Sequence, residues 1–123
     1  MCGIAGILGF QTPLDGDQIQ AMVDVLHHRG PDASRVRSYP GAKLGHTRLS
    51  ILDLSDHGLQ PMESSDGRFV IVYNGEIYNF KELRRELEAG YRFQGHCDTE
   101  VLLAAYLKWG EDCLEHLNGM FAF

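Results

Sequence analysis

Cys2 directly follows the initiator methionine, so removal of Met1 would leave a cysteine that carries a free α-amine. Such an amine titrates at about pH 7.7 to 8.0, and at neutral pH a fraction of it can accept the thiol proton. The resulting thiolate is a competent nucleophile. Position alone leaves a second interpretation open, in which Cys2 is a small buried apolar residue without a chemical role.

The dipeptide Asn74-Gly75 combines a side-chain amide with an unhindered backbone N–H. Two such donors can stabilise an oxyanion, and loss of one donor typically lowers a rate by about 100-fold or more. The dipeptide also lies between the apolar runs 69–73 and 76–78, where Asn-Gly is a strong β-hairpin signal. We therefore expect a hairpin turn here, and the turn is compatible with the catalytic role.

Arg48, Glu76 and Asp98 combine one cation with two separated anions, which suits a zwitterionic amino acid. Arginine binds a carboxylate through two parallel hydrogen bonds, and carboxylates accept hydrogen bonds from an ammonium group. Taken singly, each residue is also compatible with a solvated surface charge, and Asp98 with the cap of a following helix.

Metal, nucleotide and disulfide chemistry find little support in the sequence. The six histidines show no HExxH spacing, and the 14 glycines form neither GxGxxG nor GxxxxGK[ST]. The cysteines, at positions 2, 97 and 113, are odd in number and form no CxxC motif. We expect no metal site and no disulfide framework, and a thiol-based redox or metal protein using Cys97 and Cys113 remains a weaker alternative.

Composition and charge indicate a globular protein with one core. The chain has 123 residues, and 11 Lys and Arg against 17 Asp and Glu give a net charge of −6. This charge disfavours nucleic acid or an anionic membrane as a partner, because phosphate neutralisation needs clustered cations. No apolar run approaches the roughly 20 residues of a membrane helix, and the first residues lack the features of a secretory signal. We expect a cytoplasmic protein.

The spacing of apolar residues and turn signals predicts a mixed order of strands and helices. The first half should contain a strand over 3–10, a helix capped by Asp15 and Gln18 that stops near His28, a loop over 29–42 with a brief strand at 36–39, a strand region over 43–53 and an irregular loop over 54–67. The second half should contain the hairpin, a helix from Asn79 with Glu82 as its capping partner to Gly90, and a helix from Asp98 or Thr99 to a point before Gly110. Strands and helices that mix without βαβ alternation indicate an α+β fold.

The last residues, 120–123, are apolar and strand-like. One interpretation is a terminal strand that docks in the core. The other, which we favour, is a chain cut within a domain, because such an end would leave an open sheet edge.

Five ordered segments stand out: MCGIAGI at 1–7, RGPDA at 29–33, GHTRLSILDLS at 45–55, YNGEIYNF at 73–80 and DTEVLLAAY at 98–106. Together they resemble the glutamine amidotransferase domain of asparagine synthetases, and the resemblance runs essentially from end to end of the chain. The wider class also includes amidophosphoribosyltransferase and the glucosamine-6-phosphate and glutamate synthases.

The resemblance implies an N-terminal nucleophile hydrolase fold, a four-layer αββα sandwich with Cys2 on its first strand, incomplete at the C-terminal end of this chain. It implies that Cys2 forms a γ-glutamyl thioester from glutamine and that Asn74 and Gly75 supply the oxyanion hole. The implied substrate contacts are Arg48 to the α-carboxylate, Glu76 and Asp98 to the α-amino group, and the backbone of Leu49 and Ile51.

The resemblance also implies that residues 1–123 are a partial glutamine amidotransferase type 2 domain without its synthetase domain. Glutamine would be its substrate, and a synthetase domain in cis or in trans would transfer the ammonia to an activated aspartate. No cofactor is expected in this domain, because ATP and magnesium would belong to the absent one. The alternative is an inactive fragment that at most binds glutamine or needs the missing domain.

Overall fold

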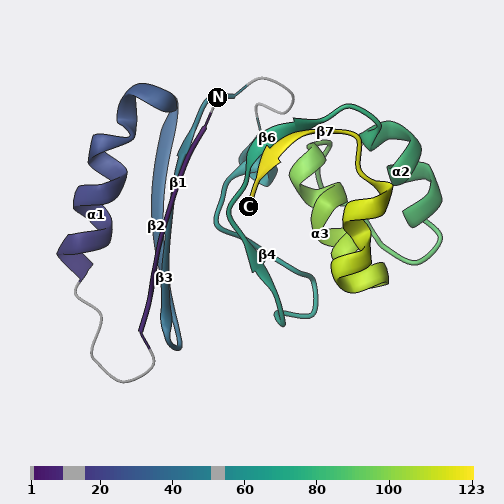
Figure 1. Ribbon diagram of the computed structural model, residues 1–123, viewed down its shortest axis with the longest axis horizontal. Helices are drawn as coiled ribbons and strands as arrows, with labels where there is room; N and C mark the ends of the chain where they lie inside the picture. Colours follow the sequence, from purple (N-terminus) through teal and green to yellow (C-terminus); the bar gives the residue numbers. More distant parts are fainter. Residues whose placement is uncertain (1, 10–15, 51–54) are drawn as a thin grey trace.

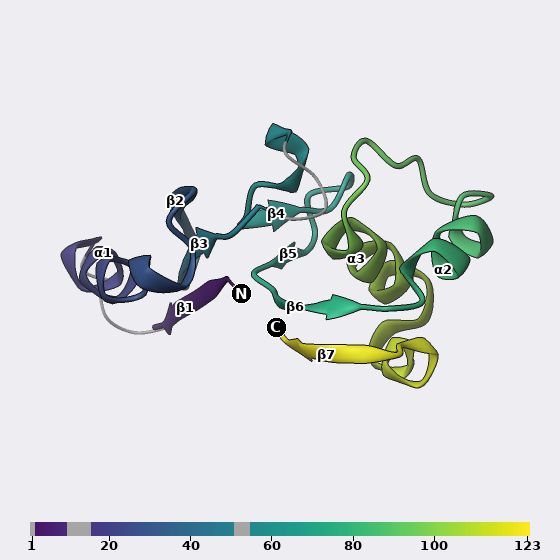
Figure 2. The same cartoon turned by 90° about the horizontal axis from the view of Figure 1, so that it is seen from above.

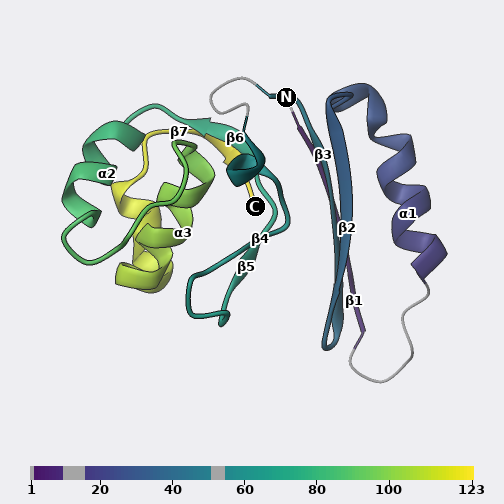
Figure 3. The ribbon, with the colours of Figure 1, turned by 180° about the vertical axis from the view of Figure 1, so that it is seen from behind.

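The computed structural model describes residues 2–9, 16–50 and 55–123, which form a mixed arrangement of helices and strands. Figure 1 shows helix α1 (Gly16–Val25) against one face of a three-stranded sheet. Two short ribbons of strands stand on the other side of that sheet, and two further helices lie beyond them (Figure 1). Figure 3, from behind, shows the same succession of layers.

The three-stranded sheet is antiparallel and has the order β1-β3-β2. Its strands are β1 (Gly3–Leu8), β2 (Ala33–Tyr39) and β3 (Ala42–Arg48). Helix α1 packs tightly on this sheet because Gly45 lacks a side chain, and a Cβ there would collide with Val23 Cγ2. Ala5, Ile19 and Val23 form the buried centre of this contact. Apolar burial of this kind stabilises the fold.

The strand predictions for the first half hold in part. The strand at the start is confirmed over residues 3–8, whereas the brief strand expected at 36–39 extends over the whole of β2. The strand region expected over 43–53 corresponds to β3, which ends at Arg48, and residues 51–53 lie outside the described residues. Helix α1 ends at Val25 and a short 3₁₀ helix, η1 (His27–Arg29), follows it. Asp15, its expected cap, lies outside the described residues.

The second half builds a separate apolar core. Its elements are η2 (Asp56–Gly58), β4 (Met62–Glu63), β5 (Val70–Ile71), β6 (Asn74–Ile77), α2 (Phe80–Leu87), α3 (Asp98–Trp109), η3 (Gly110–His116) and β7 (Gly119–Ala122). Strand β4 pairs with β5, and β6 pairs with β7, both antiparallel. The core between these ribbons and helices α2 and α3 contains Ile77, Leu83 and Leu102.

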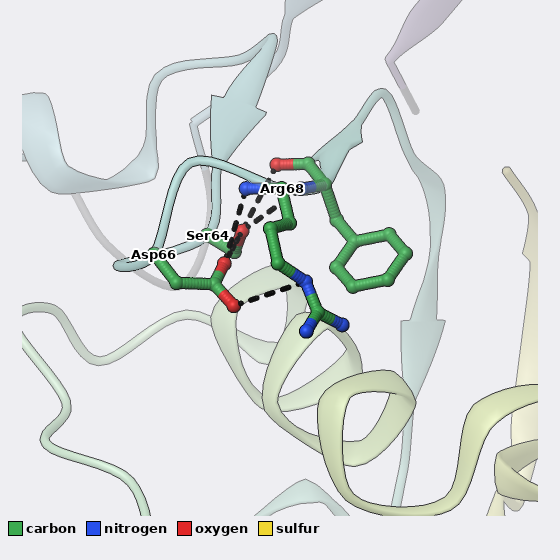
Figure 4. Close-up of polar contacts among 4 residues, drawn as sticks. Ser64, Asp66 and Arg68 are labelled. Atoms are coloured by element: carbon green, nitrogen blue, oxygen red, sulfur yellow. Dashed lines mark hydrogen bonds and ion pairs between the residues drawn. The ribbon is translucent and has the colours of Figure 1, made fainter.

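The hairpin expected at Asn74-Gly75 is wrong. The hairpin of this region lies between β4 and β5, and its loop carries Gly67 at a φ of 68°, a conformation that glycine adopts without strain. Figure 4 shows how Asp66 closes the loop: its Oδ1 accepts hydrogen bonds from the Ser64 hydroxyl at 2.6 Å and from the Arg68 backbone N–H at 3.1 Å. The expectation of an irregular loop over 54–67 is therefore wrong for the strand residues of β4.

Asn74 and Gly75 instead lie within β6, where Gly75 is paired with Phe121 of β7. A Cβ on Gly75 would lie 2.6 Å from the Phe121 Cα and would collide with the Met120 carbonyl oxygen. Glycine is therefore required here by close backbone approach and not by a turn. The last residues form a strand docked on β6, as one of the two interpretations of the sequence predicted.

Both predicted helices of the second half are present. Helix α2 follows Asn79, but the Asn79 side chain makes no capping hydrogen bond. Its amide instead donates to the His116 carbonyl at 2.9 Å and accepts from the Asn118 N–H at 2.9 Å, which fastens α2 to the segment before β7. Helix α3 begins at Asp98 and ends before Gly110, as expected. Within the described part of the chain, no helix has the length and apolar character needed to cross a membrane.

Candidate functional site

A cavity of about 140 Å³ lies between the first sheet and the second half of the chain. In Figure 2 the start of β1 and the end of β7 both lie between the first sheet and the helices of the second half. The first sheet and the residues after it contribute Cys2, His46, Arg48, Leu49 and Ser50, and later segments contribute Gly58, Gln60, Tyr73, Gly75, Glu76, Cys97, Asp98, Thr99 and Met120.

Strand alternation explains why Cys2 and Arg48 share one face of the sheet. Gly3 is paired with Thr47, and a Cβ on Gly3 would lie 2.9 Å from the Leu26 Cβ, next to the end of α1. Residues that follow or precede such a pair point to the opposite face. Cys2 and Arg48 therefore point away from α1 and toward the cavity, and His46 shares that face.

The half-buried thiol of Cys2 contacts the backbone of Leu49. The Leu49 N–H donates to Cys2 Sγ at 3.4 Å, and the thiol donates to the Leu49 carbonyl at 3.8 Å. The neighbouring backbone is fixed as well, because the Gly3 N–H donates to Thr47 Oγ1 at 3.0 Å and this hydroxyl donates to the Leu26 carbonyl at 3.1 Å.

Arg48 is 7% exposed, and its Nη1 donates to the Ser55 carbonyl at 2.9 Å. The RGPDA segment supports it: the Asp32 N–H donates to the Arg48 carbonyl at 3.0 Å, and Asp32 Oδ2 accepts from the Ser50 N–H at 2.7 Å. Gly30 permits this approach, because a Cβ there would lie 2.6 Å from the Arg48 carbonyl carbon. The RGPDA segment thus fixes the backbone around Arg48, and Ser55 binds its guanidinium group at the cavity.

Gly75 lines the cavity and Asn74, although adjacent, does not. The Asn74 Oδ1 atom is buried and has no hydrogen-bond partner among the residues that the structure describes. Buried polar atoms are normally paired, so an unpaired amide oxygen beside a cavity is unusual. The structure therefore brings the two expected donors side by side in β6 with only Gly75 reaching the cavity lining.

Asp98 is 5% exposed and forms the centre of a polar contact. Its Oδ2 accepts hydrogen bonds from the Tyr73 hydroxyl at 2.8 Å and from the Ile77 N–H at 3.0 Å. Burial and the negative charge of Asp98 raise the pKa of Tyr73, so the hydroxyl keeps its proton as a donor. The alternative role of Asp98 as a helix cap is not observed, because its side chain bonds to β6 and Tyr73.

Several residues of the cavity were not singled out from the sequence, and His46, Gln60 and Tyr73 among them have polar contacts that matter for the site. Burial lowers the pKa of His46 to about 4, a hydrogen bond to the Tyr73 backbone opposes this, and Arg48 adds to the lowering. His46 and Tyr73 lie inside the GHTRLS and YNGEIYN segments, so motif membership was an available signal. Gln60 lies in none of the five segments.

The remaining predicted residues fall in three groups. The backbone of Leu49 contacts the Cys2 thiol. Glu76 is an exposed residue that lines the cavity. Ile51 lies outside the described residues. Cys97 lines the cavity and Cys113 is buried in the second core, and neither forms a disulfide with another described residue. Burial raises the pKa of Cys113, which makes its thiol less reactive. In the described ranges no group of three or more His, Cys, Asp or Glu side chains could hold a metal ion.

Comparison with known proteins agrees with the sequence motifs. A family model described as "Glutamine amidotransferase domain" matches residues 1–123. The chain is 44% identical to "Asparagine synthetase [glutamine-hydrolyzing] 3" of Bacillus subtilis, covering 100% of the chain and 21% of that protein. It is 40% identical to "Asparagine synthetase B [glutamine-hydrolyzing]" of Escherichia coli (100% and 22%) and 36% identical to "Amidase chry2" of Gibberella zeae (100% and 20%). The chain thus spans about a fifth of the length of these relatives.

Proposed function

This chain belongs to the glutamine amidotransferase domain family, and on that premise we propose that Cys2 hydrolyses glutamine to glutamate and ammonia. The observation that carries the proposal is the cavity that gathers Cys2, Arg48, Gly75, Glu76 and Asp98 from segments far apart in the sequence. A thiol, a backbone N–H and charged side chains of both signs line this cavity, and hydrolysis of a zwitterionic amide would use such groups as nucleophile, oxyanion donor and substrate contacts.

In the proposed binding mode, Arg48 holds the α-carboxylate of glutamine, and Asp98 and Glu76 hold its α-ammonium group. The bonds from Tyr73 and Ile77 occupy Asp98 Oδ2. The other oxygen, Oδ1, then remains for the ammonium group. The backbone of Leu49 and Ile51 completes the contacts. A substrate held at both charged groups of its α-carbon presents its side-chain amide in one orientation, which favours reaction.

The proposed chemistry begins with removal of Met1, which frees the α-amine of Cys2. This amine takes the thiol proton, and the sulfur attacks the side-chain carbonyl carbon of glutamine. The Asn74 amide and the Gly75 N–H stabilise the oxyanion. The intermediate collapses to a γ-glutamyl thioester as the protonated amine returns its proton to the departing ammonia. Water then attacks the thioester, with the amine again as base, and glutamate leaves with the thiol restored.

The same proposal extends to the whole protein. We infer that the layers seen here belong to a four-layer αββα sandwich of the N-terminal nucleophile hydrolase type, of which residues 1–123 are part. The ammonia would pass to an activated aspartate in a synthetase domain in cis or in trans, and ATP and magnesium would bind in that domain. The longer asparagine synthetase relatives support this extension.

The decisive test is a Cys2→Ala variant of the protein in its natural length, assayed for glutamate and ammonia released from glutamine. We expect at least a 1,000-fold loss, on the order of what removal of a catalytic nucleophile causes. Cys113→Ala is the matched control, because that thiol is buried in the second core, and it should keep its activity. Full activity in Cys2→Ala would refute the assignment.

Met1 removal can be tested separately, by measuring intact mass. A protein that retains Met1 should fold and fail to hydrolyse glutamine, because the α-amine then belongs to the wrong residue.

A second candidate function is a chain that binds glutamine but does not hydrolyse it when isolated. Large apolar side chains favour it: Leu8, Met120 and Phe123 are 70%, 65% and 50% exposed. Such surfaces promote association with another domain or copy. The isolated 123-residue chain would then bind 1-anilinonaphthalene-8-sulfonate or self-associate. A monomer that melts cooperatively and hydrolyses glutamine would exclude this candidate.

A further inference from the structure

Tyr73 is held by side chains at its N–H, its hydroxyl and its carbonyl. Its backbone N–H donates to Gln60 Oε1 at 2.5 Å, and its hydroxyl donates to Asp98 Oδ2 at 2.8 Å. His46 supplies the third contact, a hydrogen bond to the Tyr73 backbone carbonyl. Tyr73 is 3% exposed, so water does not replace these partners.

This hold matters because Tyr73 directly precedes Asn74 and Gly75. The Tyr73 N–H and carbonyl belong to the two rigid peptide planes on either side of its Cα, so contacts to both fix the direction in which the chain enters β6. The pairing of β6 with β7 fixes the chain on the other side of the dipeptide. The two proposed oxyanion donors are thus held from both sides. Side chains bind Tyr73 upstream, and the pairing with β7 and the bond from the Ile77 N–H to Asp98 Oδ2 hold the chain downstream.

Gln60 has the features of a dedicated partner in this hold. It is 4% exposed, it lines the cavity, and its Nε2 donates to the Thr99 hydroxyl at 3.1 Å. Both ends of its amide are therefore used, one on the strand residue before the oxyanion donors and one on the first turn of α3. Burial of an amide is unfavourable unless both of its ends are paired, and the two hydrogen bonds of Gln60 compensate for this cost.

We propose that Gln60 is a positioning residue that acts through Tyr73 on the Asn74-Gly75 oxyanion donors. The proposal rests on the glutaminase function proposed above and adds a residue outside the five motifs to it. Gln60 itself touches no reacting atom. Its loss should weaken stabilisation of the transition state while leaving the contacts to the α-carboxylate and α-ammonium groups of glutamine in place.

The test is a Gln60→Met variant of the protein in its natural length, with Gln60→Glu as the conservative variant. Methionine has a similar shape but offers the Tyr73 N–H only a weakly accepting thioether sulfur, whereas glutamate keeps an oxygen at that position. We expect Gln60→Met to lower kcat about 100-fold, the scale that a small misplacement of catalytic groups can cause, with KM within about threefold. Gln60→Glu should recover at least tenfold of that loss. Gln20→Met, at an exposed position of α1, should match the unaltered protein.

A second measurement separates positioning from a general loss of structure. L-Glutamic acid γ-semialdehyde adds to a thiol and creates an oxyanion, so its Ki should rise about 100-fold in Gln60→Met. The Kd of glutamate, which creates none, should change less than threefold. Equal weakening of both ligands, or unchanged kcat in Gln60→Met, would overturn the proposal. Failure of the unaltered protein to hydrolyse glutamine would instead overturn the proposed function, so the two failures are distinguishable.

Discussion

A shift from pH 7.5 to pH 5 should destabilise the fold through His46, because its imidazole is buried and uncharged. Burial lowers its pKa to about 4 from 6.5. The unfolded chain therefore binds the proton between about pH 6.5 and pH 4, and the folded chain does not. Stability is full above pH 6.5 and falls as the pH falls through this window. Since pH 5 lies 1.5 units below the pKa of histidine in the unfolded chain, protonation of the unfolded state lowers the free energy of unfolding by about 2 kcal/mol.

Urea unfolding at both pH values measures this loss, and a His46→Asn variant isolates it from the titration of carboxylates. Asparagine can still donate to the Tyr73 carbonyl from nearly the position of an imidazole nitrogen, but it does not titrate. We expect the free energy of unfolding to fall about 2 kcal/mol more in the unaltered protein than in the variant. Equal losses in the two proteins would show that His46 is not held neutral, and the account of its burial would be wrong.

Two further substitutions test the geometry of the cavity. Gly75→Ala should cost about 1–3 kcal/mol of stability and abolish glutaminase activity, because its Cβ would meet the β7 backbone. Gly90→Ala should change neither property, because a Cβ there has no neighbour closer than 4.0 Å. Thermal melts measure the stability and glutamate release measures the activity. Tyr73→Phe removes the hydroxyl that donates to Asp98 and should raise the KM for glutamine about tenfold. Tyr106→Phe is the control and should leave the KM unchanged. An unchanged KM in Tyr73→Phe would contradict the role of this contact in binding the α-ammonium group.

The residues of the candidate site could be predicted because each lies in a contiguous segment whose residue types suit the chemistry. The structure brings Cys2, Arg48, Gly75, Glu76 and Asp98 to one cavity, although their roles stay a prediction. Strand alternation acts over a few residues, so it can be predicted from the sequence. The helix that begins at Asp98 was predicted for the same reason.

Long-range pairing could not be predicted in the same way. Asn74-Gly75 and Asp66-Gly67 both carry a hairpin signal, and only the second lies in a hairpin loop. The difference comes from Phe121, the distant residue that pairs with Gly75. Local turn propensity is weak compared with the burial and hydrogen bonding that a partner strand supplies.

Hydrogen bonds from side chains to distant backbone atoms were the second feature that the sequence did not predict. Asn79 was expected to cap α2 and instead binds the segment before β7. Gln60 gave no signal, because a glutamine that accepts from the N–H of Tyr73 looks the same in sequence as an exposed one. Such contacts depend on where two distant backbones meet in space, which the periodicity of apolar residues does not specify.

The central claim is that the sulfur of Cys2 becomes covalently joined to the side-chain carbonyl carbon of glutamine. The most direct test is to mix the protein in its natural length with isotopically labelled glutamine, quench in acid during turnover, and analyse the N-terminal peptide by mass spectrometry. The account predicts a γ-glutamyl group on Cys2, in a peptide that lacks Met1. Release of glutamate at full rate with no label on Cys2 would contradict it.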